Sequence, residues 1–481
     1  MSAYNAAMNR LWMAPVALVL VSACGGGGAS DGTTTTTGIG GETGDSLTTS
    51  ASAEGSTTNS STTDPGTGDG DGDPATGDGD GDETTSTSTS STTSGDGDGD
   101  GGSSGPKFDL PGIPDAAQGN CDMGGGNEPE FSYIWVANSG EGTISKVNTV
   151  TLEEEGRYRT RADSGGSPSR TSVNLSGDVA VANRSGGITK VIAVNDNCDE
   201  MKNGQPGLQT STGKFDVLAW GEDDCIDWST PINQSSQRPL AWTAGFLNPN
   251  TCEIEDQFVW TTASSSGQPL NVYMLDGVDG AITEEFQIPE VTAGFFGGYG
   301  GAVNSENDYW FITYDSPRRL IKVDFEDLGY QIWDVPGNVC SYGFTVDSLD
   351  RPWIGAFCGG TTMFDPESEE WTTLNDIMGY GLQEDANQTM WLGTYSPPGI
   401  RAIDINTMEV GAWIQLPTNS SRGVSVDFYG YVWFVDMQNS AWRINTEEES
   451  WEAYTGLNSP YTYSDMTGWG LSLAAGGIPQ G

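Results

Sequence analysis

Apolar residues recur in the second part of the chain in short runs that repeat at a spacing of about 40 residues. In three copies a Gly-x-x-x-Asp segment precedes a tryptophan ten residues after the glycine, at Trp353, Trp391 and Trp433. Trp310 marks a fourth copy, with Asn304 at the aspartate position. Each unit contains four short segments of β-type composition, separated by Gly, Asp, Asn and Pro, without a sustained 3.6-residue period. The repeat therefore predicts the four-stranded blades of a β-propeller.

Looser copies precede these four, so the chain shows seven repeat registers, at residues 135, 180, 260, 310, 353, 391 and 433. The unit at Trp135 lacks its preceding Gly-x-x-x-Asp strand, and the unit after Trp451 has only that strand, over residues 470–474. If residues 470–474 pair with the segment around Trp135, they complete one blade and leave no open edge. The sequence thus predicts an all-β, seven-bladed β-propeller over residues 131–481, closed by its C-terminal strand.

The repeat signature resembles that of the virginiamycin B lyase (streptogramin lyase) group of seven-bladed propellers over about residues 131–474. The resemblance rests on the Gly-x-x-x-Asp segment, the tryptophan, and an Asp or Asn in apolar context 12 to 14 residues later. It implies the propeller fold. In that group the lyase chemistry uses histidines and a glutamate around a metal on the top face. Because this chain has no histidine, no catalytic residue can be carried over, and we expect lyase activity to be absent.

One position of the repeat predicts a ligand site at the mouth of the central channel. The innermost strand of a blade starts at the top face beside this channel, so the residue just before the strand's glycine, or its equivalent, would line the mouth. These residues are Arg170, Arg238, Tyr299, Tyr342, Tyr380, Arg422 and Trp469. Aromatic faces stack on sugars or other flat ligands, and guanidinium groups hold carboxylates or phosphates. The structural alternative is packing between blades, with each arginine paired to a local aspartate.

The N-terminal residues predict export and a lipid anchor. Arg10 precedes an apolar run that ends at Ala23 and is too short to span a bilayer, which is typical of a signal peptide over residues 1–23. The residues Val-Ser-Ala before Cys24 resemble a bacterial lipobox, which implies lipidation of Cys24 and a place in the cell envelope. Gly25 after the cysteine favours the outer membrane by analogy with Gram-negative lipoproteins. An ordinary secretory signal with a chance cysteine is the alternative.

Residues 24–106 predict a disordered tether, because they consist of Ser, Thr, Gly and Asp with almost no apolar residue. Gly-Asp blocks at 68–73, 77–82 and 95–100 could suggest calcium binding, but they lack the apolar residue that each repeat of a calcium-binding coil needs. Residues 107–130 form a lead-in to the propeller. Fifteen of the 67 acidic and one of the 19 basic residues precede residue 107, so the rest carries a net charge of −34. Nucleic acid is therefore a poor partner.

Six cysteines besides Cys24 suggest disulfides in an exported protein. Cys340 and Cys358 would face each other across a hairpin, Cys198 and Cys225 bracket an insertion in the second blade, and Cys121 and Cys252 remain. Within that insertion, Asp196, Asp199 and Asn203 weakly resemble a calcium loop, and a disulfide-clamped surface loop is the alternative. Calcium is the one cofactor that the sequence suggests.

The sequence favours a non-catalytic binding module for a carbohydrate, a peptide or another envelope protein, carried as a monomer on a lipoprotein. The alternative is a metal-dependent hydrolase or lyase that uses Asp, Glu and Asn ligands, because no histidine is available. The two differ in their response to a chelator. The metal enzyme should lose activity, whereas the binding module should be indifferent.

Overall fold

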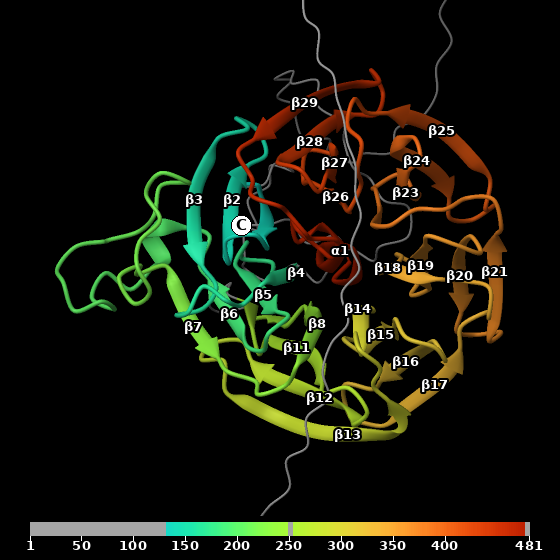
Figure 1. Cartoon of the computed structure of the whole chain (residues 1–481), viewed down its shortest axis with the longest axis horizontal. Helices are drawn as coiled ribbons and strands as arrows, with labels where there is room; N and C mark the ends of the chain where they lie inside the picture. The colour runs from blue at the N-terminus through green and yellow to red at the C-terminus, as the bar shows by residue number, and fades with distance from the viewer. Residues whose placement is uncertain (1–130, 249–253, 477–481) are drawn as a thin grey trace, which may run out of the picture. The chain divides into compact units, whose positions relative to one another are not determined.

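The computed structural model describes residues 131–248 and 254–476, and its seven antiparallel sheets are arranged as blades around one axis (Figure 1). We number the blades one to seven in chain order. The all-β, seven-bladed fold predicted from the repeat is confirmed. The predicted signal peptide (1–23), tether (24–106) and lead-in (107–130), with Cys24, Cys121 and Cys252, lie outside the described residues. No helix among the described residues is long and apolar enough to cross a membrane.

The strands run from the centre outward in most blades. Blade one contains β1 (Tyr133–Asn138), β2 (Thr143–Asn148) and β3 (Glu154–Arg159). Blade two contains β4 (Pro168–Val173), β5 (Val179–Asn183), β6 (Ile188–Val191) and β7 (Ile226–Thr230). Blade three contains β8 (Ser236–Trp242), β11 (Phe258–Ser264), β12 (Pro269–Asp276) and β13 (Ile282–Thr292). Blades four to seven contain β14 (Gly298–Val303), β15 (Tyr309–Thr313), β16 (Arg319–Val323), β17 (Tyr330–Asp334); β18 (Ser341–Val346), β19 (Pro352–Ala356), β20 (Thr361–Asp365), β21 (Glu370–Leu374); β22 (Leu382–Glu384), β23 (Thr389–Tyr395), β24 (Pro398–Asp404), β25 (Val410–Gln415); β26 (Gly423–Val426), β27 (Val432–Val435), β28 (Ser440–Asn445) and β29 (Ser450–Thr455). Outside the blades lie the hairpin β9 (Phe246–Leu247) and β10 (Ile254–Glu255), the 3-10 turn η1 (Asn195–Asn197) and helix α1 (Trp469–Ala474).

The aspartate of the repeat holds the turn between the first two strands of a blade. Asp427 accepts hydrogen bonds from the backbone N–H groups of Tyr429 (2.9 Å) and Tyr431 (3.0 Å) and from Trp433 Nε1 (2.8 Å). Asp347 and Asp385 each accept the same three bonds in their own blades. Three donors on one buried carboxylate explain why the tryptophan follows the aspartate at a fixed six-residue spacing.

Blade four shows what the aspartate adds. Asn304 accepts the two backbone bonds of the turn, from Glu306 and Asp308. Its amide nitrogen replaces the second carboxylate oxygen and donates to Asp308 instead. The buried Trp310 Nε1 then has no partner among the described residues. An asparagine therefore keeps the turn but not the bond to the indole.

The hydrophobic core consists of separate clusters, most of which join neighbouring blades. One cluster packs Trp353 and Met363 of blade five against Leu392 and Ile403 of blade six. Burying one such side chain contributes about 1.5–3 kcal/mol. Since each blade covers the apolar face of the next, the ring is stable only when it is closed.

The C-terminal segment closes the ring, but not through the predicted strand. Residues 460–466 run beside β1. Trp135 N donates to Met466 O (2.8 Å), and Tyr461 N donates to Ala137 O (3.1 Å). Asn138 and Pro460 form an isolated antiparallel β-bridge. Residues 460–466 occupy the innermost position of blade one, which otherwise has three strands. The prediction that residues 470–474 form this strand is wrong, since they belong to helix α1, which lies near the centre of the ring (Figure 1).

Asp465 explains why a helix forms there. Its carboxylate accepts hydrogen bonds from the backbone N–H groups of Thr467, Gly468 and Leu471, where the helix begins. A carboxylate at this end satisfies N–H groups that have no partner inside the helix. In addition, the residue that aligns with Asp427 is Ala474, which has no carboxylate to hold a strand-to-strand turn.

Two of the predicted disulfides are confirmed. Cys198–Cys225 clamps the long insertion between β6 and β7 of blade two, with Cα atoms 4.9 Å apart. Cys340–Cys358 joins the segment before β18 to the loop after β19, with Cα atoms 5.0 Å apart.

Candidate functional site at the mouth of the central channel

Six of the seven residues predicted to line the channel mouth lie at the starts of the inner strands. Arg170, Arg238, Tyr299 and Tyr342 stand early in β4, β8, β14 and β18, and Tyr380 and Arg422 lie just before β22 and β26. Their side chains form a continuous series from blade three to blade seven. The centroid of the Tyr299 ring is 5.3 Å from both the Arg238 guanidinium and the Tyr342 ring. Tyr342 and Tyr380 are 4.6 Å apart, and Arg422 lies 4.9 Å from the Tyr380 ring.

Trp469 does not belong to this group, so its predicted place in the mouth is wrong. It lies in α1, at the other ends of the inner strands, where Nε1 donates to the carbonyl of Glu384 at the end of β22 (2.9 Å). Its ring packs against Phe428, which follows β26. The misplacement follows directly from the helix that replaces the expected closing strand.

Tyr461 and Tyr463 fill the centre of the mouth, and the sequence analysis missed them. They lie on the segment that closes the ring, so that the arginines reach them from several blades. The Arg170 guanidinium is 3.1 Å from the Tyr463 ring centroid, and those of Arg184 and Arg422 are 4.7 Å and 5.3 Å from that of Tyr461. Placing the closing strand at residues 460–466 would have predicted this, because side chains two residues apart on a strand point to the same face.

The mouth concentrates positive charge in an acidic protein. Arg170, Arg184, Arg238 and Arg422 form no ion pair with any carboxylate that the structure describes. The structural alternative therefore holds in part: the tyrosines pack against one another across neighbouring blades, but the pairing of the arginines with local aspartates is not found within residues 131–248 and 254–476. Arg170, Arg238, Tyr299 and Tyr342 are nevertheless buried, whereas Arg184, Arg422, Tyr380 and Tyr461 are partly exposed and form the accessible rim.

Several guanidinium nitrogen atoms at the mouth are buried without a hydrogen-bond partner among the described residues. They are all three of Arg170, Nε and Nη1 of Arg238, and Nε of Arg422. Arg184 and Arg422 donate only to neutral oxygen atoms, the carbonyls of Ser167 and Ser421 and the Ser167 hydroxyl. Burying a charged donor without an acceptor costs roughly 1–3 kcal/mol or more, and the contacts of Arg170 and Arg238 with tyrosine rings offset part of that cost.

The pKa values of Arg184 and Tyr461 are shifted in the directions expected next to several positive charges. Burial and the charges of Arg238 and Arg170 lower the pKa of Arg184. Burial alone would raise the pKa of Tyr461, but the charge of Arg170 and hydrogen bonds with Tyr299 (3.2 Å) and Tyr342 (2.7 Å) outweigh it and bring this pKa down to about 8. The site is therefore built to favour negative charge.

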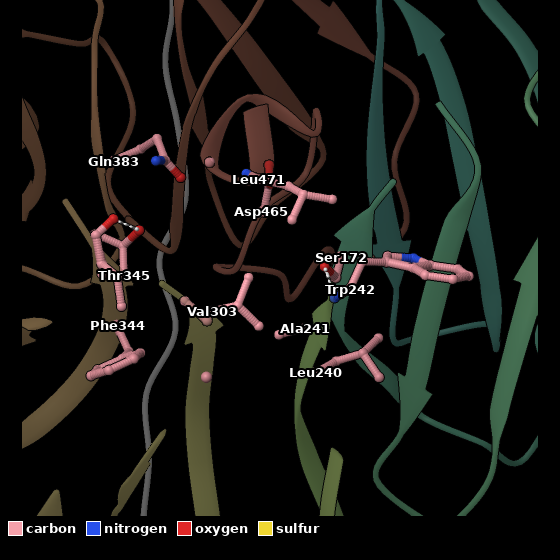
Figure 2. A pocket seen from close by; sticks show the side chains of 14 residues that line it. Ser172, Leu240, Ala241, Trp242, Val303, Phe344, Thr345, Gln383, Asp465 and Leu471 are labelled. Carbon is pink, nitrogen blue, oxygen red and sulfur yellow. Dashed lines mark hydrogen bonds between the residues drawn. The ribbon is translucent and has the colours of Figure 1, made fainter. Parts of the chain in front are cut away.

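The opposite end of the channel is closed by α1, and we call it the plugged end. Between it and the mouth lies a cavity of about 30 Å³ (Figure 2). Its lining includes Ser172, Trp242, Thr345, Gln383, Asp465 and Leu471. Gln383 Nε2 is buried and has no partner among the described residues. A polar cavity of this size has room for a water molecule, which would satisfy the amide.

The predicted calcium loop in blade two gains little support. Asp196 and Asp199 are exposed, and Asn203 is engaged within the insertion, where Nδ2 donates to Gln209 Oε1 and to the Glu222 carbonyl, both at 3.0 Å. The described part of the chain contains no group of three or more Asp, Glu or Cys side chains placed to hold a metal ion. Calcium binding by Asp196, Asp199 and Asn203 stays a prediction.

Solved structures resemble the chain at low sequence identity. No family profile and no curated protein matches the chain. Among solved structures, it is similar to virginiamycin B lyase from Staphylococcus aureus with quinupristin, at 16% identity and a TM-score of 0.42, over 60% of this chain and 84% of that one. AztD from Citrobacter koseri is similar at 9% identity and a TM-score of 0.44, over 69% and 97% of the two chains. The dihydro-heme d1 dehydrogenase NirN has 11% identity and a TM-score of 0.44, over 72% and 78%.

Proposed function

We propose that the propeller is a non-catalytic binding module of a cell-envelope lipoprotein and that it takes the anionic group of a ligand at the channel mouth. The observation that carries this proposal is the cluster of four arginines without a carboxylate partner among the described residues. Guanidinium forks bind carboxylates and phosphates, and the surrounding tyrosine rings supply flat apolar faces. The ligand is an acidic carbohydrate, an acidic peptide, or an acidic segment of another envelope protein.

The cost of the unpaired arginines supports a ligand rather than a purely structural role. Buried charges that serve stability are normally paired, because an unpaired ion loses its hydration without compensation. An incoming carboxylate or phosphate would meet the partly exposed guanidinium groups of Arg184 and Arg422, which donate only to neutral oxygen atoms, and would be attracted by the buried Arg170 and Arg238. Binding would therefore relieve a defect of the ligand-free protein.

The anion site can be tested by calorimetric titration of the full chain with trigalacturonate, tri-glutamate and inorganic phosphate. We expect at least one probe to bind and Arg422→Gln to weaken it at least ten-fold, since a charged hydrogen bond is lost. Arg443→Gln is the matched control, because it removes the same charge from a residue that pairs with Glu452. The anion site would be refuted if none of the three probes gave a heat of binding, or if the two variants bound a probe with equal affinity. Loss of binding in chelator would favour the metal-dependent alternative instead.

The anchor is tested separately through Cys24. If the thiol is lipidated, Cys24→Ser should move the protein from the membrane fraction to the soluble fraction after export. Three acyl chains on one residue would make the difference nearly complete, because each buried CH₂ contributes about 0.8 kcal/mol. Equal partitioning of the two proteins would show that residues 1–23 act as an ordinary secretory signal.

A further inference from the structure

A groove beside blade six contains an exposed aromatic ring and meets the mouth at one point, where Tyr395 packs against Tyr380 with ring centroids 5.2 Å apart. It has a volume of about 430 Å³, within the range of about 300–1,000 Å³ that is typical of small-molecule sites. Its lining includes Asp376 and Met378 from the loop before β22, Thr394 and Tyr395 from β23, Arg401 from β24 and Trp413 from β25. Polar and aromatic side chains thus converge on one hollow from blade six and from the loop that leads into it.

Trp413 differs from two other tryptophans of the outer strands. Trp333 stacks on Trp310 at 5.5 Å, and Trp371 packs against Phe364 at 4.9 Å, so one face of each ring is covered by another ring. Trp413 instead stands opposite Arg401 in the sheet and is 37% exposed. Its ring is a rigid apolar surface that the groove presents to solvent.

Polar contacts hold this ring in place. Trp413 Nε1 donates to Thr394 Oγ1 at 3.2 Å, and the Arg401 guanidinium lies 5.4 Å from the ring centroid. Two anchors fix the orientation of the indole before any ligand arrives, which lowers the entropic cost of binding. Arg401 Nε is buried and has no hydrogen-bond partner among the described residues, so it can take an acceptor from a ligand.

We infer that this groove binds a saccharide, with the C–H face of a hexopyranose on the Trp413 ring. The exposed carboxylate of Asp376 accepts bonds from ring hydroxyls, and Arg401 donates to a hydroxyl or a carboxylate of the sugar. A flat apolar platform beside one acceptor and one donor matches a molecule that has an apolar face and a polar edge. This inference does not rest on the anion site at the mouth.

Trp451 provides a matched control. It lies on β29, the outer strand of blade seven, and is 40% exposed, but its neighbour in the sheet is Ile444 rather than an arginine. Replacing Trp413 or Trp451 by alanine removes the same side chain from a similarly exposed position. The contrast between the two variants therefore measures the groove and not the general loss of a surface tryptophan.

The experiment titrates the full chain with cellohexaose, mannohexaose and hexagalacturonate in a calorimeter. We expect at least one of these probes to bind, with an affinity at least ten-fold lower in Trp413→Ala and unchanged in Trp451→Ala. Asp376→Ala and Arg401→Gln should weaken the same probe several-fold, and they test the groove even if Trp413→Ala folds poorly. Absence of binding by all three probes, or equal affinities of the two tryptophan variants, would overturn the inference.

The Arg422→Gln variant separates this site from the mouth. A saccharide that binds in the groove keeps its affinity in Arg422→Gln and loses it in Trp413→Ala. The reverse pattern would place the sugar at the mouth, which would support the proposed function and overturn the groove. Neutral and acidic hexasaccharides distinguish whether Arg401 meets a hydroxyl or a carboxylate.

Discussion

The two ends of the central channel are made by the same inner strands, yet their buried charged groups differ in whether they have hydrogen-bond partners. At the plugged end, the buried carboxylates of Asp347, Asp385 and Asp427 each accept at least three hydrogen bonds. At the mouth, six buried nitrogen atoms of three arginines have no partner among the described residues. The aspartates have a structural role because the repeat unit also supplies their hydrogen-bond donors. The arginines are available to a ligand because their repeat units supply no acceptor.

The largest expected effect is at the plugged end. Asp427→Ala removes one acceptor from Tyr429 N, Tyr431 N and Trp433 Nε1. Trp433 Nε1 is buried and the two backbone donors are partly buried, so we expect the loss of their acceptor to lower the free energy of unfolding by roughly 2–4 kcal/mol. Chemical denaturation measures it. Asp404→Ala is the control, because Asp404 is exposed and holds only the turn after β24. Equal losses in both variants would contradict the structural role of the buried carboxylate.

The second effect is a pH dependence that also arises at the plugged end. Burial raises the pKa of Glu384 to about 7, against the lowering by hydrogen bonds from Ser348, and the charges of Asp347 and Asp385 add to the rise. Since the folded protein keeps a proton that the unfolded chain releases above its ordinary pKa, the stability falls as the pH rises from about 4.5 to 7. Over this pH range the free energy of unfolding should fall by up to about 3 kcal/mol.

Glu384→Gln should remove the part of this slope between about pH 6 and 7, because the amide oxygen can still accept from Ser348 but cannot titrate. Denaturation curves at several pH values measure the change. A slope of the same sign should persist below about pH 6, since burial also raises the pKa of Asp427 to about 6. An unchanged slope in the variant would show that Glu384 is not the group that titrates.

A much smaller effect on stability is expected at the mouth. Arg170→Met removes three unpaired buried nitrogen atoms but also the contacts with the rings of Tyr463 (3.1 Å) and Tyr299 (4.7 Å). Because the cost of burying the cation and the gain from the rings oppose each other, the free energy of unfolding should change by less than about 1 kcal/mol. A loss comparable to that of Asp427→Ala would show that Arg170 is a structural residue and would weaken the proposed anion site.

The same comparison explains what could be predicted from the sequence. The Gly-x-x-x-Asp segment and its tryptophan are local, because the carboxylate, its turn and the indole lie within eleven residues of Gly423. The blades, their number and the position of six mouth residues therefore followed from the repeat. The hairpin disulfide Cys340–Cys358 was predictable for the same reason, since a hairpin sets which residues face each other.

The closing segment could not be placed from the repeat alone. Residues 470–474 carry the glycine of the pattern, but the helix depends on Asp465, which lies outside the repeat and caps α1. That shift moved Trp469 to the plugged end and brought Tyr461 and Tyr463 into the mouth. The contacts of Arg184, Arg170 and Tyr461 join residues that are far apart in the sequence, and no local pattern encodes them.

The smallest expected effect is spectroscopic and tests the field of the mouth without changing the fold. The chain has 16 tyrosines, and the pKa of Tyr461 lies near 8, so one tyrosinate should form before most of the others in an ultraviolet difference titration. Since the folded-state value lies below the ordinary one, stability should rise with pH between about 8 and 10. Tyr461→Phe should abolish the early step, and Arg170→Met should move it to higher pH, because the charge that lowers the pKa of Tyr461 is removed while Arg184 and Arg422 remain beside the ring. An early step that survives in Tyr461→Phe would assign it to another tyrosine, and one that does not move in Arg170→Met would show that the buried arginine does not set the charge of the mouth.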